Sequence, residues 1–500
     1  MTSDTSTYRT VVGCEIHVQL KTKTKMFSPA ANDPDSKEPN VNIDEIVTGQ
    51  PGSLPVVNEE AVRLGVMLGL ALNCTIPEYS KFDRKHYFYP DLPKGYQISQ
   101  YDEPIAQKGW VEIEVGGKTK RVGITRAHLE EDAGKNVHPE GLSYSLVDYN
   151  RAGAPLLEIV TDPDIESAEE ARIFLQELQN IVRYVGAGSA DMEKGTMRCE
   201  PNISVRKPGE TTLPKYKVEV KNINSFKFAE SAINYEVERQ TKILEEGGMP
   251  RQVTMGWNEK GSFTVEQRSK EEANDYRYFP EPDLPVLHFT KEYVDLLRNS
   301  LPELPAAKRK RFKEEYGLPG ADIDNLIAWK DLNEYFENTV SELNAWVATD
   351  KDAGVNLDSA KLTKQVANWC LQDFSALLNA GHLDPSESKV TPENLAEMVT
   401  LIEQGKISNS AAKQVFKVMF EKGGEPDAIV EDLGLTQVSD ESAIGDAIQK
   451  VITENPKAVE DFKAGQQKSF GFLVGQAMKE LKGKGNPQVL NDLLRKELSK

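Results

Sequence analysis

Short runs of alternating apolar and polar residues dominate the first 293 residues of the chain, and glycine and proline separate these runs. Alternation with a period of two is typical of a β-strand with one buried face. The clearest runs predict strands at 11–20, 110–115, 143–147, 201–205 and 216–220. Three other segments repeat apolar residues at helical spacing, which predicts helices at 61–72, 165–185 and 229–245.

The pattern changes after the segment 280–285 (PEPDLP), where each proline disfavours helix in the residue before it. From about residue 294 onward the spacing is helical, most clearly in 361–380, 392–405 and 409–422. We therefore predict an α+β fold in three domains. A β-rich domain spans 1–293, an all-α helical domain 294–407, and a small helical tail domain 408–500.

Composition places the chain among soluble globular proteins, because 39% of its 500 residues are hydrophobic and 28% are charged. The longest uncharged apolar stretch, 64–77, is too short for a membrane helix, which needs about 20 residues. The first ten residues lack the apolar core of a signal peptide. The four cysteines are far apart and form no CxxC pair, which suits a reducing compartment. We expect a cytoplasmic protein without a membrane partner.

The net charge of −19 argues against indiscriminate binding to nucleic acid, but this charge is unevenly distributed. Residues 421–461 hold three basic and eleven acidic side chains, whereas residues 463–500 hold eight basic and three acidic ones. Lys479, Lys482 and Lys484 lie beside glycines in this basic tail. They predict a local phosphate contact, and a solvated helix end is the plainer alternative.

The first candidate for chemistry is the predicted strand that contains Glu15 and His17. Because side chains alternate across a strand, these two share one face, about 7 Å apart, while apolar residues face the core. A carboxylate beside an imidazole can hold a divalent cation or relay a proton. On spacing alone, a half-solvated strand with polar residues outside is favoured.

Two further segments place acidic groups in unusual positions. In 126–134 (RAHLEEDAG), an extended chain puts His128, Glu130 and Asp132 on one face. Massed carboxylates repel one another unless a cation or basic groups lie between them, and such oxygen ligands suit Mg²⁺. A solvated acidic turn is the alternative. Glu158 interrupts an apolar run, so it either meets a cationic partner or lies in water at a strand edge.

Residues 85–96 (KHYFYPDLPKGY) interleave lysines with aromatic rings, a pattern that suits nucleobase stacking and phosphate attraction. An aromatic core strand followed by a proline turn is the alternative. The sequence contains no GxxxxGK[ST] loop, no GxGxxG turn before a helix and no GxSxG elbow. A nucleotide site, or a source of ammonia, would therefore need an unusual site or a partner.

These segments belong to a set of nine that occur in one characteristic order. They are GCEIHVQLKTKTKMF (13–27), KHYFYPDLPKGYQISQ (85–100), HLEEDAGK (128–135), DYNRAGAPLLEIVTDPDI (148–165), SADMEKGTMRCEPNISVR (189–206), VEVKNINSF (218–226), DYRYFPEPDLP (275–285), ISNSAAKQVF (407–416) and GFLVGQAMKELKGKGNP (471–487). Through them the chain resembles, essentially end to end, the B subunits of aspartyl/glutamyl-tRNA(Asn/Gln) amidotransferases.

The resemblance implies a carbon–nitrogen ligase that acts on tRNA misacylated as Glu-tRNA(Gln) or Asp-tRNA(Asn). ATP, with Mg²⁺, phosphorylates the side-chain carboxyl of the attached amino acid, and ammonia then replaces the phosphate. The logic is chemical, since a carboxylate oxygen is a poor leaving group and a phosphate is a good one. Such phosphoryl transfer needs positioning and charge neutralisation more than covalent help.

The resemblance also implies roles for individual residues. Glu15, His17, Glu130 and Glu158 would face Mg²⁺, and Lys85 would face phosphate. Lys94 and Glu131 would lie where the ammonia path enters, and Glu131 counts among the catalytic residues. The remaining motif residues would bind substrate or nucleotide: Tyr87 and Tyr89 around the aminoacyl-adenosine, and Arg151, Asp191, Arg198, Lys221 and Asn222 without an individual assignment. Lys479, Lys482 and Lys484 would contact tRNA.

For partners, the resemblance implies an amidase-type A subunit that releases ammonia from glutamine and a small C subunit, together a heterotrimer. The β-rich domain would be a catalytic cradle, and the tail, similar to YqeY, would bind tRNA. Many relatives carry four zinc-binding cysteines, but here the first pair aligns with Ser28 and Ala30, and the second with Asp44 and Val47. Without a thiolate, we expect no zinc.

Two other hypotheses compete with the enzyme subunit. One is a tRNA-binding adaptor with a decayed active site, against which the retained acids, His17 and Lys85 argue. The other is a self-sufficient amide ligase that uses free ammonium without partner subunits.

Overall fold

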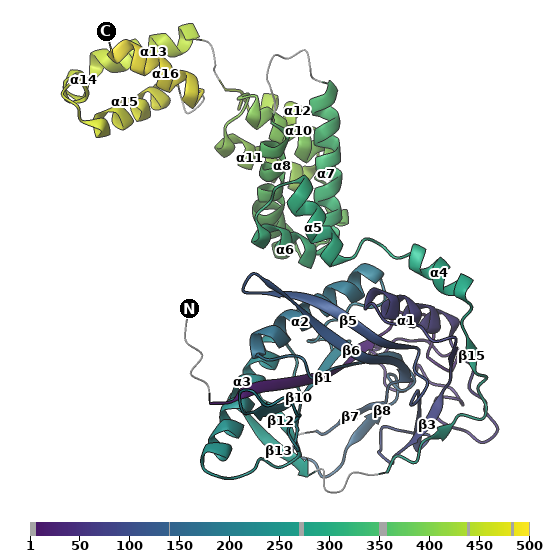
Figure 1. Ribbon diagram of the computed structural model, residues 1–500. Coiled ribbons are helices and arrows are strands. Elements are labelled where there is room, and N and C mark those ends of the chain that lie inside the picture. Colours follow the sequence, from purple (N-terminus) through teal and green to yellow (C-terminus); the bar gives the residue numbers. More distant parts are fainter. Residues whose placement is uncertain are drawn as a thin grey trace. The chain divides into compact units, whose positions relative to one another are not determined.

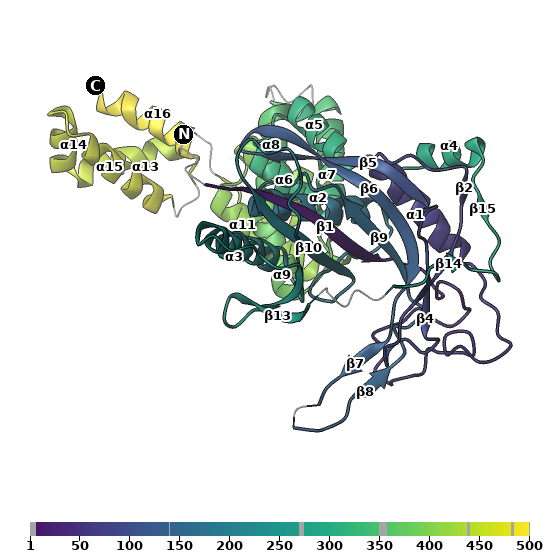
Figure 2. The same cartoon turned by 60° about the horizontal axis from the view of Figure 1, so that its bottom comes forward.

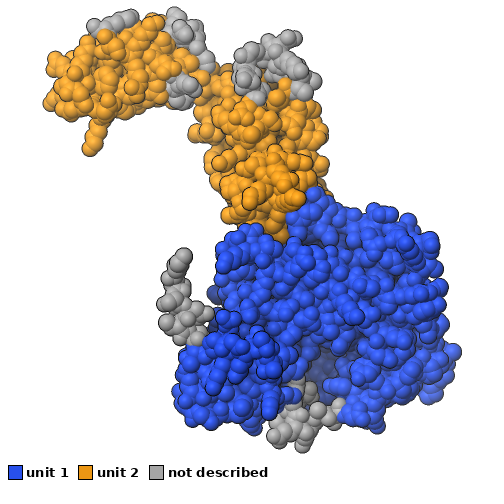
Figure 3. All heavy atoms as spheres, in the orientation of Figure 1, with its two compact units in different colours: residues 1–308 blue, residues 309–500 orange. Residues whose placement is uncertain are grey.

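The computed structural model describes residues 7–139, 141–269, 275–349, 358–437, 441–481 and 485–499. The chain forms two compact units, residues 1–308 and residues 309–500, which Figure 3 shows in different colours. The first is built from strands and helices and the second from helices, so the predicted α+β class with helical domains is confirmed. The domain boundaries at 293 and 407 stay predictions.

An eight-stranded sheet forms the centre of the first unit, in the order β13-β12-β11-β10-β1-β9-β6-β5. Its neighbouring strands are antiparallel, except that β11 and β12 run parallel. The strands are β1 (Arg9–Gln19), β5 (Ala106–Val115), β6 (Lys118–Glu131), β9 (Pro155–Thr161), β10 (Met197–Arg206), β11 (Val218–Lys221), β12 (Val253–Asn258) and β13 (Phe263–Ser269).

Helices cover one face of this sheet, and the alternation in β1 decides which face. Its apolar residues, such as Ile16 and Val18, belong to one core with residues of α1 (Glu59–Ala71), α2 (Ala168–Val185) and α3 (Phe226–Glu245). Figure 1 shows these helices beside the strands. Glu15 and His17 alternate with the apolar residues, so they lie on the opposite face.

Local sequence explains where these helices begin and end. The side chains of Asn58, Ser167 and Ser225 accept hydrogen bonds from backbone N–H groups of the first turns of α1, α2 and α3. Acidic residues in the first turns of α1 and α2 stabilise these helices, because their negative charge lies at the positive end of each helix dipole. Gly186, with φ of 77°, ends α2 in the left-handed conformation that glycine adopts without strain.

Three smaller sheets complete the first unit: β14-β3-β4, β15-β2 and β7-β8. Their strands are β2 (Tyr79–Ser80), β3 (Asp83–His86), β4 (Tyr96–Ser99), β7 (Lys135–Val137), β8 (Leu146–Asp148), β14 (Phe279–Pro280) and β15 (Leu287–His288). Figure 2 shows the β7–β8 ribbon extending outward. The strand predicted at 143–147 was wrong in extent, because it begins at Leu146 and residues 143–145 are exposed without a core to pack against.

In the described part of the remaining chain, the regular elements are helices. They are α4 (Lys291–Asn299), α5 (Pro305–Glu315), α6 (Gly320–Ala328), α7 (Lys330–Thr349), α8 (Ser359–Trp369), α9 (Ser375–Gly381), α10 (Pro392–Glu403), α11 (Asn409–Lys422), α12 (Pro426–Asp432), α13 (Glu441–Glu454), α14 (Pro456–Lys463), α15 (Gln467–Glu480) and α16 (Pro487–Leu498), with a 3₁₀ turn at Pro385–Glu387. The helix predicted at 361–380 contains a π-helical turn at Cys370–Phe374. Helices α13–α16 share an apolar core of their own.

Candidate functional site

Strand pairing places polar side chains in a row across one face of the large sheet. This is the face opposite α1, α2 and α3, and we call it the open face. In the register of β10, β1, β9 and β6, Arg198 pairs with His17, His17 with Glu158, and Glu158 with His128. Glu130 lies two residues beyond His128 on β6, so it shares that strand's face. Strand β9 lies between β1 and β6, and this order brings residues far apart in sequence onto one surface.

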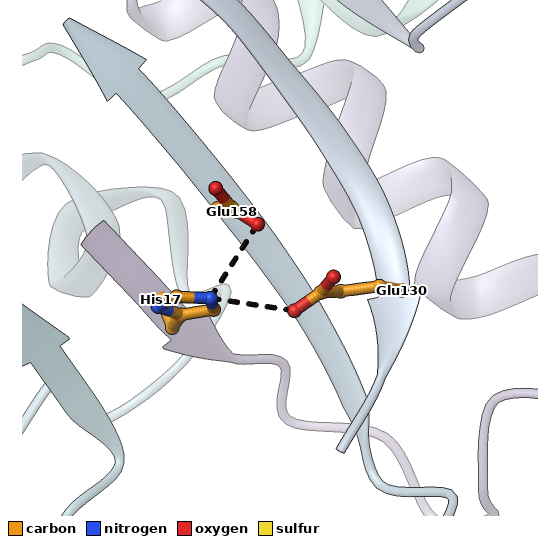
Figure 4. Close-up of side chains that lie close together, drawn as sticks. All are labelled: His17, Glu130 and Glu158. Atoms are coloured by element: carbon orange, nitrogen blue, oxygen red, sulfur yellow. Dashed lines mark ion pairs between the residues drawn. The ribbon is translucent and has the colours of Figure 1, made fainter. Parts of the chain in front are cut away.

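His17, Glu130 and Glu158 point toward one another, as Figure 4 shows. The Nε2 atom of His17 lies 3.4 Å from Oε1 of Glu130 and 3.4 Å from Oε2 of Glu158. Glu130 and Glu158 are buried, and Ser99 Oγ donates to the other oxygen of Glu130 over 3.4 Å. One ligand atom from each of the three lies within 4.8 Å of the others, a geometry that can hold a divalent cation.

The electrostatics of this group favour positive charge at its centre. Burial works against a charged His17, but the carboxylates of Glu158 and Glu130 outweigh it and raise the pKa of His17 to about 9. Burial also works against a charged Glu158, yet His128 and His17 hold the pKa of that carboxyl well below its usual range. The Glu158 carboxylate therefore stays ionised in a largely dry environment.

Glu15 lies in a second acidic group rather than in the first. It pairs with Glu200 across β1 and β10, and its carboxylate, with those of Glu200 and Glu219, forms a second potential cation site. Lys221 Nζ lies 2.5 Å from Glu200 and 3.5 Å from Glu219. Asn202 donates to Glu15 over 3.0 Å. Sequence reasoning missed Glu200 and Glu219, although Glu219 lies within the predicted strand 216–220 and Glu200 directly precedes the predicted strand 201–205.

Lys85 reaches the first acidic group from a different sheet. It lies on β3, and the neighbouring strand β4 packs against β6. Burial lowers the pKa of Lys85, but attraction from Glu130, Tyr278 and Glu158 outweighs that effect and raises it, so the ammonium stays charged. This Nζ also lies 5.0 Å from the centre of the Tyr276 ring.

Aromatic rings surround Lys85. The Tyr101 and Tyr278 rings stack with centroids 4.3 Å apart, and Tyr276 makes edge contacts with Tyr278 and Tyr87. Of the two tyrosines that the resemblance assigned to the substrate pocket, Tyr87 lies near Lys85, whose Nζ is 5.9 Å from the centre of its ring, whereas Tyr89 is 63% exposed. Sequence reasoning assigned no role to Tyr276 or Tyr278, although both lie in the motif 275–285.

Three ion pairs border the first acidic group. Lys94 pairs with Glu131, and both side chains are buried. Arg198 donates to Asp132 over 2.8 Å, and Arg151 Nε lies 3.4 Å from the same oxygen. Burial raises the pKa of Asp132, but the two guanidinium groups outweigh it and lower that pKa. The sequence pattern predicted Asp132 on the same face as His128 and Glu130, but it assigned no role to Asp132.

The other residues that the sequence predicted for substrate or tRNA binding lie in separate places. Asp191 shapes a turn, because its carboxylate accepts from the backbone N–H of Glu193 over 2.9 Å. Asn222 follows Lys221 with φ of 63°, in the left-handed region that asparagine tolerates. Lys479 is exposed on α15. Lys482 and Lys484 lie outside the described residues.

The fold and site define a class of protein in which the open face of a mixed sheet carries carboxylates, imidazoles and a lysine, and helical domains follow. Comparison with known families specifies this class further. The family model described as "GatB/GatE catalytic domain" matches residues 10–295, and the model described as "GatB domain" matches residues 355–498. The chain belongs to the GatB/GatE family.

Curated relatives match almost the whole chain. A protein of Thermotoga maritima is 49% identical over 98% of this chain and 99% of its own length. A protein of Carboxydothermus hydrogenoformans is 47% identical over 99% of both. Both relatives are named as the B subunit of aspartyl/glutamyl-tRNA(Asn/Gln) amidotransferase. Among the described helices, none combines the length and apolar character that crossing a bilayer requires.

Proposed function

We propose that this chain is the B subunit of a tRNA-dependent amidotransferase, a ligase that converts Glu-tRNA(Gln), Asp-tRNA(Asn) or both into the amidated forms. The observation that carries the proposal is near-complete coverage at 47–49% identity with relatives of that name. The buried group of His17, Glu130 and Glu158 supports it, because the reaction must handle phosphate beside a carboxylate.

A divalent cation such as Mg²⁺ fits the donors at this site. Two buried carboxylates and, once it releases its proton, an imidazole offer three ligand atoms within 4.8 Å of one another. His17, Glu130 and Glu158 would hold the ion, and Glu15 would belong with Glu200 and Glu219 to a second position. The bound ion would supply positive charge against the phosphate oxygens of ATP.

The chain's own residues neutralise and orient the reactants. An oxygen of the substrate carboxylate attacks the γ-phosphorus of ATP, the bond to ADP breaks, and an acyl phosphate forms. Lys85 and Arg198 present positive charge to the transferring phosphoryl group, and Asp132 fixes the guanidinium of Arg198. The nitrogen of ammonia then attacks the acyl carbon, phosphate leaves, and the nitrogen loses a proton.

The ammonia comes from partner proteins in this proposal, an amidase-type A subunit accompanied by a small C subunit. The buried Lys94–Glu131 pair would line the entry of ammonia. Tyr87 would face the aminoacyl-adenosine, with Tyr276 and Tyr278 beside it. Tyr89, Arg151, Asp191, Lys221 and Asn222 remain predicted contacts for substrate or nucleotide.

We include no zinc. The positions where relatives carry cysteines hold Ser28, Ala30, Asp44 and Val47, a set without sulfur ligands. Ser28 Oγ donates to Asp44 over 2.5 Å, and Val47 is buried. A hydrogen bond and packing therefore connect the two segments. Elemental analysis that found one zinc per chain would refute this part of the proposal.

The decisive experiment compares Glu130→Gln with wild type in complexes that contain the A and C subunits. We expect the variant to lose about 100-fold or more of the amidation rate on Glu-tRNA(Gln) and Asp-tRNA(Asn), assayed separately, while tRNA binding persists. Glu112→Gln is the matched control, because Glu112 is a partly exposed carboxylate of the same sheet that pairs with Arg121. Wild-type amidation by Glu130→Gln would instead favour an adaptor, and amidation with ammonium by the chain alone would favour a self-sufficient ligase.

A further inference from the structure

His128 is a buried histidine at the edge of the first acidic group, and the proposed reaction gives it no task. It is 5% exposed and lies on β6, opposite Glu158 of β9. Its Nε2 atom lies 3.1 Å from Oε2 of Glu158 and 3.8 Å from Oε2 of Glu130. His17 approaches that same oxygen of Glu158 from the opposite side, over 3.4 Å.

The two histidines differ in access. The side chain of His17 is 18% exposed, while that of His128 is 6% exposed. A ligand that enters from the open face therefore reaches His17 more readily than His128. One imidazole is placed to contact a ligand, and the other to hold a carboxylate.

Hydrogen bonding indicates which nitrogen of His128 carries the proton. Its Nδ1 atom is buried and has no hydrogen-bond partner among the described residues. A proton on Nδ1 would thus be a buried donor without an acceptor, which is unfavourable. A proton on Nε2 meets the oxygen of Glu158, so the Nε2–H tautomer fits this environment.

We propose that His128 is a positioning residue that donates from Nε2 to Glu158 and fixes this carboxylate toward His17 and Glu130. The proposal rests on the proposed function, because it assumes that these three side chains hold a divalent cation. Hydrogen bonds to ligating carboxylates orient them and tune affinity for the ion. His128 itself contacts neither the ion nor the substrate.

The test measures binding of Mn²⁺, a probe for the Mg²⁺ site, to the intact complex by electron paramagnetic resonance. His128→Leu fills the space with an apolar side chain of moderate bulk and removes the N–H donor. We expect about 10–100-fold weaker binding of Mn²⁺. His128→Gln restores an N–H donor at a similar reach and should recover most of the affinity. Amidation by His128→Leu should require correspondingly more Mg²⁺ and recover at saturation.

Thr161→Val is the matched structural control. Thr161 is a buried residue of β9 on the opposite face from Glu158, and its hydroxyl accepts from the N–H of Cys14 and donates to the carbonyl of Asp162. This variant should lower the melting temperature without changing Mn²⁺ affinity. If wild type binds Mn²⁺ but His128→Leu binds it equally well, or if His128→Gln fails to recover affinity, the role of His128 is refuted. Absence of Mn²⁺ binding in wild type would refute the cation site itself, and the role of His128 with it.

Discussion

At the scale of single residues, Lys25 shows how the chain satisfies a charge that is fully enclosed. The side chain is inaccessible to solvent, and its Nζ donates to the backbone carbonyls of Asn150, over 2.8 Å, and Ala152. These carbonyls belong to the loop before β9, the strand that carries Glu158. Burial lowers the pKa of Lys25 to about 8, although Asp44 and Glu131 favour its charged form.

This lowered pKa predicts a pH-dependent contribution to stability. Between pH 8 and 10.5, the ordinary pKa of lysine, the unfolded chain binds more protons at Lys25 than the folded chain does. The free energy of unfolding should therefore rise with pH in this range. We expect wild type to gain stability relative to Lys25→Met between about pH 8 and 10, measured by urea unfolding of the full chain. Parallel pH profiles of the two proteins would contradict the prediction.

The buried Lys94–Glu131 pair gives a second prediction at this scale. Removing one partner leaves an uncompensated buried charge, so Lys94→Met and Glu131→Gln should each cost about 3–5 kcal/mol of stability. The double variant leaves neither charge and should cost less than the sum of the two. A double-mutant cycle on unfolding free energies checks this, and strictly additive losses would show that the pair is not coupled.

At the scale of elements, a hydrogen bond joins the segment after β1 to the turn at residues 44–47. Asp44 accepts from Ser28 Oγ and also from the backbone N–H groups of Ile46 and Val47. One carboxylate thus closes its own turn and connects it to the segment after β1. This arrangement needs only a hydroxyl and a carboxylate, both of which the sequence supplies.

Ser28→Ala should loosen this connection. We expect a loss of about 1–3 kcal/mol, because the variant leaves a carboxylate oxygen of Asp44 without its donor. Hydrogen exchange should accelerate at the amides of Ile46 and Val47. Ser53→Ala is the control, since its hydroxyl donates to backbone carbonyls at an exposed position of the same loop. Equal exchange in wild type and Ser28→Ala would show that packing alone holds the turn.

At the scale of elements, sequence patterns predict the faces of a strand but not its pairing partners. The alternation of 11–20 predicted the face that Glu15 and His17 share, because strand alternation is a local property, whereas the run 155–161 left the surroundings of Glu158 open. Neither pattern could show that β9 pairs with both β1 and β6, since register depends on contacts distant in sequence. The short strand at Leu146–Asp148 was predicted too long for a similar reason.

At the scale of the whole molecule, a chain with a net charge of −19 is proposed to bind a polyanion. Local charge resolves this conflict, because residues 463–500 carry eight basic and three acidic side chains. Lys479 is exposed at the end of α15, near the C-terminus of the tail. Binding should therefore depend on a few local phosphate contacts and on shape, without strong affinity for unrelated RNA.

Lys479→Glu tests this view. We expect weaker tRNA binding by the complex and a logarithmic salt dependence that is flatter by roughly 0.9 for each phosphate that is no longer neutralised. Lys457→Glu is the matched control, because Lys457 is an exposed lysine of α14, in the same group of four helices. Filter binding at several salt concentrations measures both. Unchanged affinity and slope in Lys479→Glu would remove this residue from the tRNA site.

The sequence by itself determined the α+β class, the change from a β-rich part to a helical part, the family and most of the residues that gather at the site. These follow from local periodicity and from motifs, which survive in a linear chain. Only the tertiary structure grouped Glu15 with Glu200 and Glu219, brought Tyr276 and Tyr278 beside Lys85, and placed His128 against Glu158. Strand register decides such groupings, and register arises from packing between segments distant in sequence.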